Sequence, residues 1–181
     1  MKIHTTPIAG IQIIEPQVFS DARGYFFESY QKEKFKKSGI EAEFIQDNES
    51  LSQKNTVRGL HFQAPPFAQG KLVRVIQGRV YDVCVDIRKN SPTYGKHFGI
   101  ELSAQNHLML WIPVGFAHGF SVLEDNTIFV YKCTEVYHKE SEGGILWNDA
   151  TLNIDWKVSE PIVSEKDRNL PTFNTFISPF E

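Results

Sequence analysis

The sequence predicts an all-β fold, an antiparallel β-sandwich or barrel of the jelly-roll kind with few short helices. Aromatic residues make up 13% of the 181 residues, with 14 Phe among them, and this favours pleated, half-buried surfaces. Many short runs alternate apolar and polar residues, and Gly and Pro separate these runs at fairly even spacing. The length suits one ordinary domain, so residues 1–181 are expected to form a single unit.

The composition argues against several functional classes. The formal net charge is −3, from 19 basic and 22 acidic residues, whereas general nucleic-acid binding needs a basic face. No segment reaches the roughly 18 consecutive apolar residues of a membrane helix, and the N-terminus lacks the apolar core of a signal peptide. Cys84 and Cys133 lie in separate strand-like runs, which favours two buried, reduced thiols. We therefore expect a cytoplasmic protein without a membrane or nucleic-acid partner.

The first 30 residues predict short strands broken by Pro and Gly. Residues 21–24 form a turn signal, and residues 25–30 predict an aromatic strand. The period of two places Phe26 and Glu28 on one face of that strand. Glu28 is then either a hydrogen-bond acceptor for a ligand or a solvent-facing edge residue.

Residues 31–38 predict the one convincing short helix, with Phe35 as its buried anchor and Gly39 placed to end it. Residues 44–50 then pass from an apolar strand into an amide-rich loop. The amides of this loop either make local turns or read the edge of a base or sugar.

Residues 58–63 place a histidine between apolar neighbours, with an arginine before it and Lys71 after it. If this segment is a strand, Gly59, His61 and Gln63 share one face, and Leu60 and Phe62 lie on the other. A lone histidine in an apolar strand is most often a packing residue. Histidine also titrates nearest to neutral pH, which makes it a natural general base.

The middle of the chain continues the strand pattern. Residues 71–88 predict a hairpin that turns at residues 77–79, and its second arm alternates as a half-buried antiparallel strand. Residues 99–102 and 108–112 predict two further strands.

Two later segments add polar candidates. His118 lies between two phenylalanines and is either a structural histidine or a site residue. Residues 127–134 predict a strong strand in which Tyr131 shares the face of Phe129 and Cys133. Residues 164–168 are a charged turn.

A metal site is disfavoured by the histidine spacing. The six histidines are widely separated, and no His-x-His pair occurs. His61 and His118 could still form a facial site with one carboxylate. Lys71 and Arg58 near the same face would repel a dication, however, so we expect no metal. A β-sandwich that only binds a sugar stays open, because aromatic and amide side chains suit that role.

Carbon-acid chemistry explains the combination of histidine, lysine and tyrosine best. Removing a proton next to a carbonyl needs a base, charge stabilisation for the enolate and, for inversion, an acid on the opposite face. His61 can be the base, Lys71 can stabilise the enolate oxygen, and Tyr131 can return the proton.

An ordered set of motifs along nearly the whole chain resembles the dTDP-4-dehydrorhamnose 3,5-epimerase family. The motifs are Asp21-x-Arg23-Gly24, Phe26-x-Glu28, Gln46-Asp47-Asn48-x-Ser50, Arg58-Gly59-Leu60-His61-Phe62-Gln63, Lys71, Gly115-x-Ala117-His118-Gly119-Phe120, Tyr131-Lys132-Cys133-Thr134 and Ser164-x-Lys166-Asp167. Their order makes the resemblance more specific than any one motif.

The resemblance implies a cupin-type jelly roll that works without metal or cofactor, as a homodimer with N-terminal strands exchanged between subunits. The implied substrate is a dTDP-sugar, dTDP-4-dehydro-6-deoxy-D-glucose, inverted at C3 and C5 to dTDP-4-dehydro-L-rhamnose. The resemblance makes His61 the base, Asp167 its carboxylate partner, Tyr131 the acid and Lys71 the enolate stabiliser. It also implies a substrate-binding set, namely Arg23, Glu28, Gln46, Asp47, Asn48, Arg58, His118, Glu142 and Lys166.

Some of these assignments depend on the resemblance alone. Glu142 and Lys166 lie in loop-like segments, where a surface charge is the common explanation. Two alternatives also stay open: an epimerase that inverts only C3 or C5 of a related 4-keto sugar, and a non-catalytic sugar-binding cupin.

Overall fold

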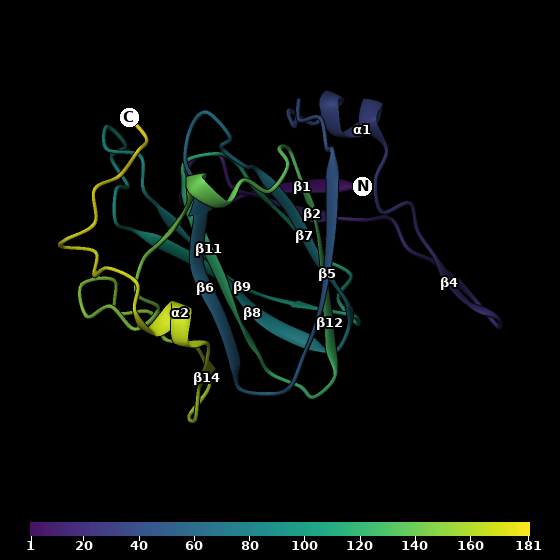
Figure 1. Cartoon of the computed structure of the whole chain (residues 1–181). Helices are drawn as coiled ribbons and strands as arrows, with labels where there is room; N and C mark the ends of the chain where they lie inside the picture. Colours follow the sequence, from purple (N-terminus) through teal and green to yellow (C-terminus); the bar gives the residue numbers. More distant parts are fainter.

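The computed structural model describes residues 1–181 and consists of two facing β-sheets (Figure 1). The first sheet has the order β1 (Lys2–Thr5), β2 (Gln12–Glu15), β10 (Met109–Ile112), β7 (Lys71–Gln77), β12 (Thr127–Cys133) and β5 (Gln46–Ser52). The second has the order β13 (Glu142–Gly144), β6 (Thr56–Gln63), β11 (Phe116–Val122), β8 (Arg79–Asp86) and β9 (His97–Ser103), with β14 (Ile162–Val163) beside β6. All pairs are antiparallel except β14 with β6, which confirms the predicted all-β, antiparallel class.

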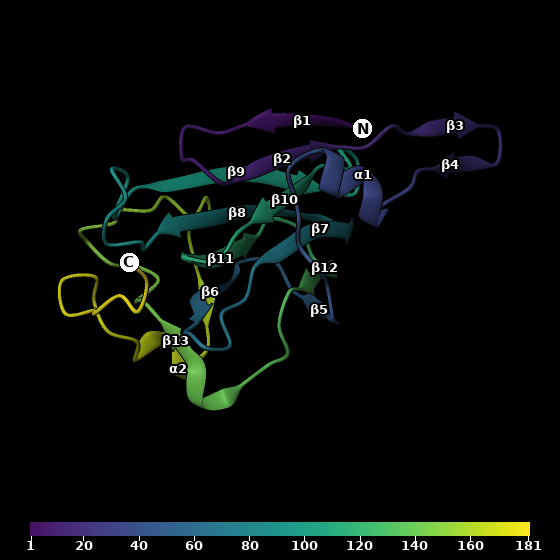
Figure 2. The same ribbon diagram turned by 90° about the horizontal axis from the view of Figure 1, so that it is seen from above.

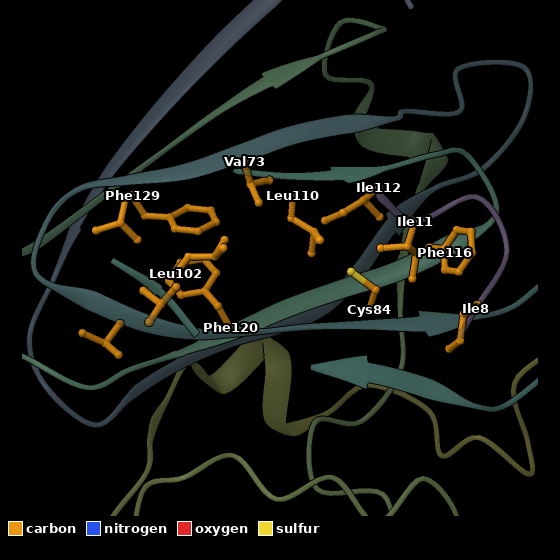
Figure 3. Packing of buried hydrophobic residues seen from close by; sticks show 13 residues of the cluster. Ile8, Ile11, Val73, Cys84, Leu102, Leu110, Ile112, Phe116, Phe120 and Phe129 are labelled. Atoms are coloured by element: carbon orange, nitrogen blue, oxygen red, sulfur yellow. The ribbon is translucent and has the colours of Figure 1, made fainter. Parts of the chain in front are cut away.

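The main hydrophobic core lies between the two sheets, where side chains from both interdigitate (Figure 3). Val73 and Phe129 enter it from the first sheet, and Cys84 and Phe120 enter it from the second. Burying a side chain of this size stabilises the fold by roughly 1.5–3 kcal/mol. Cys84 and Cys133 are both buried free thiols, as the sequence predicts.

A second core covers the outer face of the second sheet. Val83 and Val85 of β8 pack there against Ile145 and Trp156 of the C-terminal segment. The prediction of a half-buried strand was therefore wrong, because β8 is covered on both faces. Residues 145–180 supply the cover, and no pattern within β8 itself indicates it.

The predicted helix is confirmed as α1 (Lys32–Lys37). The Gln31 side chain caps it by accepting a hydrogen bond from the Lys34 backbone N–H at 2.6 Å. Phe35 is buried against Ile14 and Leu72, so the helix covers part of the outer face of the first sheet.

The charged segment 164–168 is a second short helix, α2 (Glu165–Arg168), rather than a turn. The Ser164 hydroxyl accepts a hydrogen bond from the Asp167 backbone N–H at 3.1 Å and so caps it. One helical turn is too short to give a detectable 3.6-residue period.

A 3₁₀ turn, η1 (Lys139–Ser141), lies between β12 and β13. None of the helices has the length and apolar character needed to span a membrane.

The predicted hairpin over residues 71–88 was wrong. Its arms are β7 and β8, which belong to different sheets: β7 pairs with β10 and β12, whereas β8 pairs with β9 and β11. Gly78, with φ of +77°, lets the chain turn from one sheet to the other. Alternation within each arm predicts a strand but says nothing about its partner.

The amide-rich segment after residue 45 is strand β5, not a loop. Its backbone pairs along the whole length of β12, with Asn48 opposite Tyr131. The ladder of backbone hydrogen bonds therefore outweighs the low strand propensity of the amides.

A two-stranded ribbon, β3 (Phe19–Asp21) and β4 (Gly24–Phe26), projects away from the sandwich (Figure 2). The predicted aromatic strand reaches only to Phe26. Tyr25 and Phe26 are 58% and 70% exposed. The ribbon therefore leaves two large aromatic side chains in solvent in the single chain.

Candidate active site

All four predicted catalytic side chains line one cavity between the sheets, with a volume of about 580 Å³. His61 comes from β6 of the second sheet, and Lys71 and Tyr131 come from β7 and β12 of the first. Asp167 of α2 lies at the same cavity, which also contains the predicted Arg58, His118 and Lys166. The cavity therefore has a histidine on one wall and a tyrosine with a lysine on the other.

His61 and Asp167 form a histidine–carboxylate pair, with 2.7 Å between Nε2 and Oδ1. The Gly59 backbone N–H donates a further hydrogen bond to Oδ2 of Asp167 at 3.2 Å. Burial alone would raise the pKa of Asp167, but the bonds from His61, Gly59 and Ser164 lower it below its ordinary value. Asp167 is thus held as a carboxylate and orients the imidazole.

A second histidine–carboxylate pair lies beside the first. His118 of β11 faces His61 across the strand pair, and its Nε2 is 2.9 Å from Oδ2 of Asp82. Both side chains are buried, and Oδ1 of Asp82 has no hydrogen-bond partner. Asp82 was missed at the sequence level. The feature that could have identified Asp82 is the presence of an acidic residue inside a strongly apolar strand.

Lys71 and Tyr131 have perturbed pKa values. Burial lowers the pKa of Lys71 below 10.5, against the opposing influence of Cys133 and Asp82. Burial raises the pKa of Tyr131 above 10.0, and Cys133 raises it further. The phenol is therefore protonated at neutral pH, as a proton donor must be. The Lys71 ammonium lies 5.9 Å from the centre of the Tyr131 ring.

Arg58 and His61 share the cavity face because β6 contains one extra residue between them. Opposite β11, His118 pairs with His61 and Phe120 pairs with Arg58. Arg58 was expected near the same face as His61 and Lys71, and all three side chains line the cavity. The irregularity falls at Gly59, whose φ is +135°. A Cβ atom there would lie 2.5 Å from the Gly119 Cα atom, so the position requires glycine.

Glu142 does not line the cavity itself but forms an ion pair with Lys166, which does, with 2.6 Å between Oε2 and Nζ. Glu142 lies in β13 and Lys166 in α2, so neither is in an irregular loop. The Tyr137 hydroxyl donates to the same Glu142 oxygen at 3.0 Å. Burial would raise the pKa of Glu142, but Lys166, Tyr137 and the nearby His61 lower it. Tyr137 was not identified from the sequence.

The amide strand β5 divides its side chains between two faces. Asn48 lies opposite Tyr131, and its Nδ2 is 3.6 Å from Cys133 Sγ. Gln46 is on the same face and donates to the Asn48 side-chain oxygen at 3.1 Å. Asp47 points the other way, to Lys132 at 3.0 Å on the outer face of the first sheet. The structure therefore does not bring Asp47 into the cavity, because neighbouring strand residues face opposite sides.

Arg23 and Glu28 do not line the cavity of their own chain. Arg23 is on the projecting ribbon and pairs with Asp21 at 2.6 Å. Glu28 follows the ribbon and pairs with Lys34 of α1 at 2.8 Å. Both side chains are solvent exposed in the single chain.

No three side chains among histidine, cysteine, aspartate and glutamate are placed together to hold a metal ion. The cavity instead presents a base, a buried cation and a neutral phenol. With the base and the phenol on opposite walls, this arrangement can remove a proton from one face of a carbon acid and return one to the other.

Comparisons with known proteins agree with this chemistry. The family model described as dTDP-4-dehydrorhamnose 3,5-epimerase matches residues 5–175. A dTDP-4-dehydrorhamnose 3,5-epimerase from Shigella flexneri is 53% identical over 170 residues, which cover 93% of this chain and 94% of that protein.

Solved structures of epimerases also match this chain over nearly its whole length. The crystal structure of dTDP-4-dehydrorhamnose 3,5-epimerase from Elizabethkingia anophelis has a TM-score of 0.92 at 51% identity and covers 96% of this chain and 97% of that one. A 3,5-epimerase from Legionella pneumophila in complex with dTDP-4-keto-L-rhamnose has a TM-score of 0.94 at 47% identity, with coverage of 97% and 94%. A 3′-monoepimerase from Streptomyces bikiniensis in complex with dTDP-quinovose has a TM-score of 0.90 at 30% identity, with coverage of 95% and 88%. The chain belongs to the dTDP-4-dehydrorhamnose 3,5-epimerase family.

Proposed function

We propose that this protein is a nucleotide-sugar epimerase of dTDP-L-rhamnose biosynthesis. It converts dTDP-4-dehydro-6-deoxy-D-glucose to dTDP-4-dehydro-L-rhamnose by inverting C3 and C5. The observation that carries the proposal is the opposed placement of the His61–Asp167 pair and Tyr131 across one cavity, with Lys71 beside the tyrosine.

The reaction follows from this geometry. His61 removes the proton at C3 or C5, and the electron pair of the broken C–H bond moves towards the C4 carbonyl to form an enolate. The Lys71 ammonium stabilises the charge on the C4 oxygen. Tyr131 donates its proton to the opposite face of the carbon, and the carbonyl reforms. Both carbons flank C4, so one enolate-stabilising group serves both inversions.

The charged residues at the cavity suit a nucleoside diphosphate. Arg58 and Lys166 line it, and a guanidinium meets phosphate oxygens in bidentate geometry. The inward amides Gln46 and Asn48 lie beside Tyr131 and are suited to bind the sugar.

The exposed ribbon supports a homodimer with exchanged N-terminal strands. Arg23 and Glu28 cannot bind substrate in the cavity of their own chain, but they can do so if the ribbon of one protomer reaches the cavity of its partner. The exposed aromatic side chains of the ribbon would be buried by the same contact.

Two reduced cysteines are compatible with action in the cytoplasm.

A mono-epimerase is the second candidate, because a 3′-monoepimerase shares the fold. Its identity of 30% is well below the 51% and 47% of the two 3,5-epimerase structures, which favours double inversion. A sugar-binding protein without activity would leave the His61–Asp167 pair and the buried Lys71 without a role.

Proton NMR of dTDP-4-dehydro-6-deoxy-D-glucose in D₂O tests the proposal directly. Wild-type protein should place deuterium at both C3 and C5, with or without EDTA. His61→Ala and Tyr131→Phe should each slow turnover by about 10²- to 10⁴-fold, the usual contribution of a general base or acid. Exchange at one carbon only would identify a mono-epimerase. Binding without exchange would disprove the enzyme assignment for this substrate, and loss of activity with EDTA would identify a metal-dependent cupin.

A further inference from the structure

Three glutamine side chains hold the backbone of one segment that is linked to the cavity through Glu142 and the cavity-lining Lys166. This rim segment, Glu135–His138, follows β12 on the way to β13 (Figure 2). Gln69 donates to the Glu135 carbonyl at 2.7 Å, Gln63 donates to the Val136 carbonyl at 2.9 Å, and Gln46 accepts from the Tyr137 N–H at 2.8 Å. Consecutive residues of an irregular segment are therefore fixed by side chains from outside it.

Gln63 contributes most to this arrangement. Its amide nitrogen donates to the carbonyls of Phe67 and Val136, and its oxygen accepts from the His138 N–H at 2.8 Å. Gln63 is only 4% exposed and does not line the cavity. It therefore has no free polar group for a ligand, and its contacts all go to the rim segment and the neighbouring 64–70 loop.

The rim segment connects Gln63 to the candidate catalytic groups. Tyr137 donates its hydroxyl to Glu142, Glu142 pairs with Lys166, and the next residue, Asp167, bonds His61. His61 and Gln63 lie two residues apart on β6. A chain of hydrogen bonds, one ion pair and backbone links thus connects Gln63 to His61 on the same strand.

We infer that Gln63 is a positioning residue that fixes Tyr137 and Glu142 beside the cavity-lining Lys166 and so sets the affinity for the nucleotide sugar. This inference rests on the proposed function. Without the Gln63 amide, the rim segment loses two hydrogen bonds, at Val136 and His138, and samples more conformations, which must be ordered again when substrate binds. The His61–Asp167 pair has its own support from Gly59 and Ser164, so the proton transfers are unaffected.

Gln63→Met tests the inference, because methionine keeps the shape of the side chain and removes its hydrogen bonds. Gln77→Met is the control: Gln77 also ends a strand and donates to the carbonyl of a turn, Asn126, at 3.0 Å, but it is exposed and lies away from the cavity. We expect Gln63→Met to raise the KM for the dTDP-sugar and the calorimetric Kd for dTDP about 10-fold, as for a lost buried hydrogen-bonding group, with kcat within about 3-fold. Gln77→Met should change none of the three values.

A double-mutant cycle separates positioning from general loss of stability. If Gln63 acts through the rim, Gln63→Met should have a much smaller effect on KM in a Tyr137→Phe background than in the wild type. Should Gln63→Met fail to fold, Gln69→Met removes the neighbouring contact to Glu135 and is expected to raise KM in the same direction.

The inference would be overturned by a folded Gln63→Met protein with the KM and Kd of the control, or by a fall in kcat with KM unchanged. Additive effects in the double mutant would also overturn it. Failure of the proposed function is recognised separately, because the wild-type protein would then not exchange the C3 and C5 protons, whether or not it binds dTDP.

Discussion

The chemistry of this cavity depends on two buried or half-buried histidine–carboxylate pairs on neighbouring strands. The His61–Asp167 pair presents its imidazole to the cavity, whereas the His118–Asp82 pair is almost fully enclosed. Asp82 also raises the pKa of Lys71 and so opposes the effect of burial on the ammonium. One carboxylate therefore supports both a histidine and the cation that stabilises the enolate.

Asp82→Asn should shift the alkaline limb of the pH profile of kcat/KM to lower pH. The Lys71 ammonium must be protonated to stabilise the enolate, and its pKa is already below 10.5. Removing the negative charge of Asp82 lowers that pKa further, so protonated Lys71 is lost at a lower pH. We expect kcat at neutral pH to fall about 10-fold, within the range of a charge-assisted interaction. The measurement is kcat/KM between pH 6 and pH 10.

Asp125→Asn is the control for this profile, because Asp125 is exposed and bonds only the Lys54 backbone N–H. An alkaline limb that stays in place in Asp82→Asn, or moves to higher pH, would contradict the assigned role of Asp82.

At the scale of single elements, the end of β8 shows how a buried charge is tolerated. Asp86 has no exposed surface, and its carboxylate accepts hydrogen bonds from Arg88, Ser91 and Thr93. The Arg88 guanidinium also donates to the Ala9 carbonyl at 3.1 Å and lies 4.5 Å from the Phe116 ring centre. This network ties the N-terminal loop to the second sheet.

The stability that Asp86 contributes should disappear in acid. Burial would raise its pKa, but the bonds from Arg88, Ser91 and Thr93 lower it from 3.8 to about 2. A lowered folded-state pKa adds stability that is fully present above pH 4 and is lost as the pH falls through 2. The shift corresponds to roughly 2 kcal/mol. Urea unfolding of Asp86→Asn should therefore show a large loss of stability relative to wild type at pH 7 and a smaller loss at pH 3.

Asp155→Asn is a matched exposed variant and should leave the unfolding free energy nearly unchanged at both values of pH, because its partner Lys157 is also exposed. An equal deficit of Asp86→Asn at pH 7 and pH 3 would show that the lost stability comes from packing and not from the carboxylate.

At the scale of the whole molecule, two surfaces of the single chain are exposed although they carry apolar side chains. The ribbon of β3 and β4 exposes Phe19, Tyr25 and Phe26. The outer face of the first sheet, beyond the part that α1 covers, has a hollow of about 390 Å³ that includes Ile76 and Val130. Both features are explained if two copies associate and each ribbon packs against the other copy.

Phe26→Ser should weaken this association and reduce activity together. The side chain is 70% exposed in the single chain, so its replacement should not destabilise the monomer. Loss of the aromatic contact should raise the dimer dissociation constant about 10-fold or more, since interface aromatics carry a large share of binding energy. Sedimentation equilibrium and kcat/KM measured over a dilution series check both effects.

Ile177→Ser provides the comparison, because Ile177 is 86% exposed in the C-terminal segment and lies outside the ribbon. Wild-type protein that is monomeric and fully active at micromolar concentration would disprove the exchange of ribbons and the contribution of Arg23 and Glu28 to the partner's cavity.

The sequence predicted the positions of strands and helices better than it predicted which strands pair with each other. The strands over residues 127–134 and 58–63 and the helix at residues 31–38 follow from local periodicity and capping, and all three are present. The hairpin over residues 71–88 failed because periodicity records which face of a strand is apolar, not which strand lies beside it. The one-turn helix α2 was missed because so short a segment has no period to detect.

The sequence alone determined the all-β class, the family resemblance and the main candidate residues, since alternation, turn residues and motif order are properties of the linear chain. Only the tertiary structure decided how Arg58 and His61 come to share a face, that Asp47 points outward, and that Asp82 supports His118. These facts depend on an extra residue in β6, on the pairing of β5 with β12, and on the meeting of β8 with β11. Each is set by packing between segments distant in sequence, which no local pattern contains.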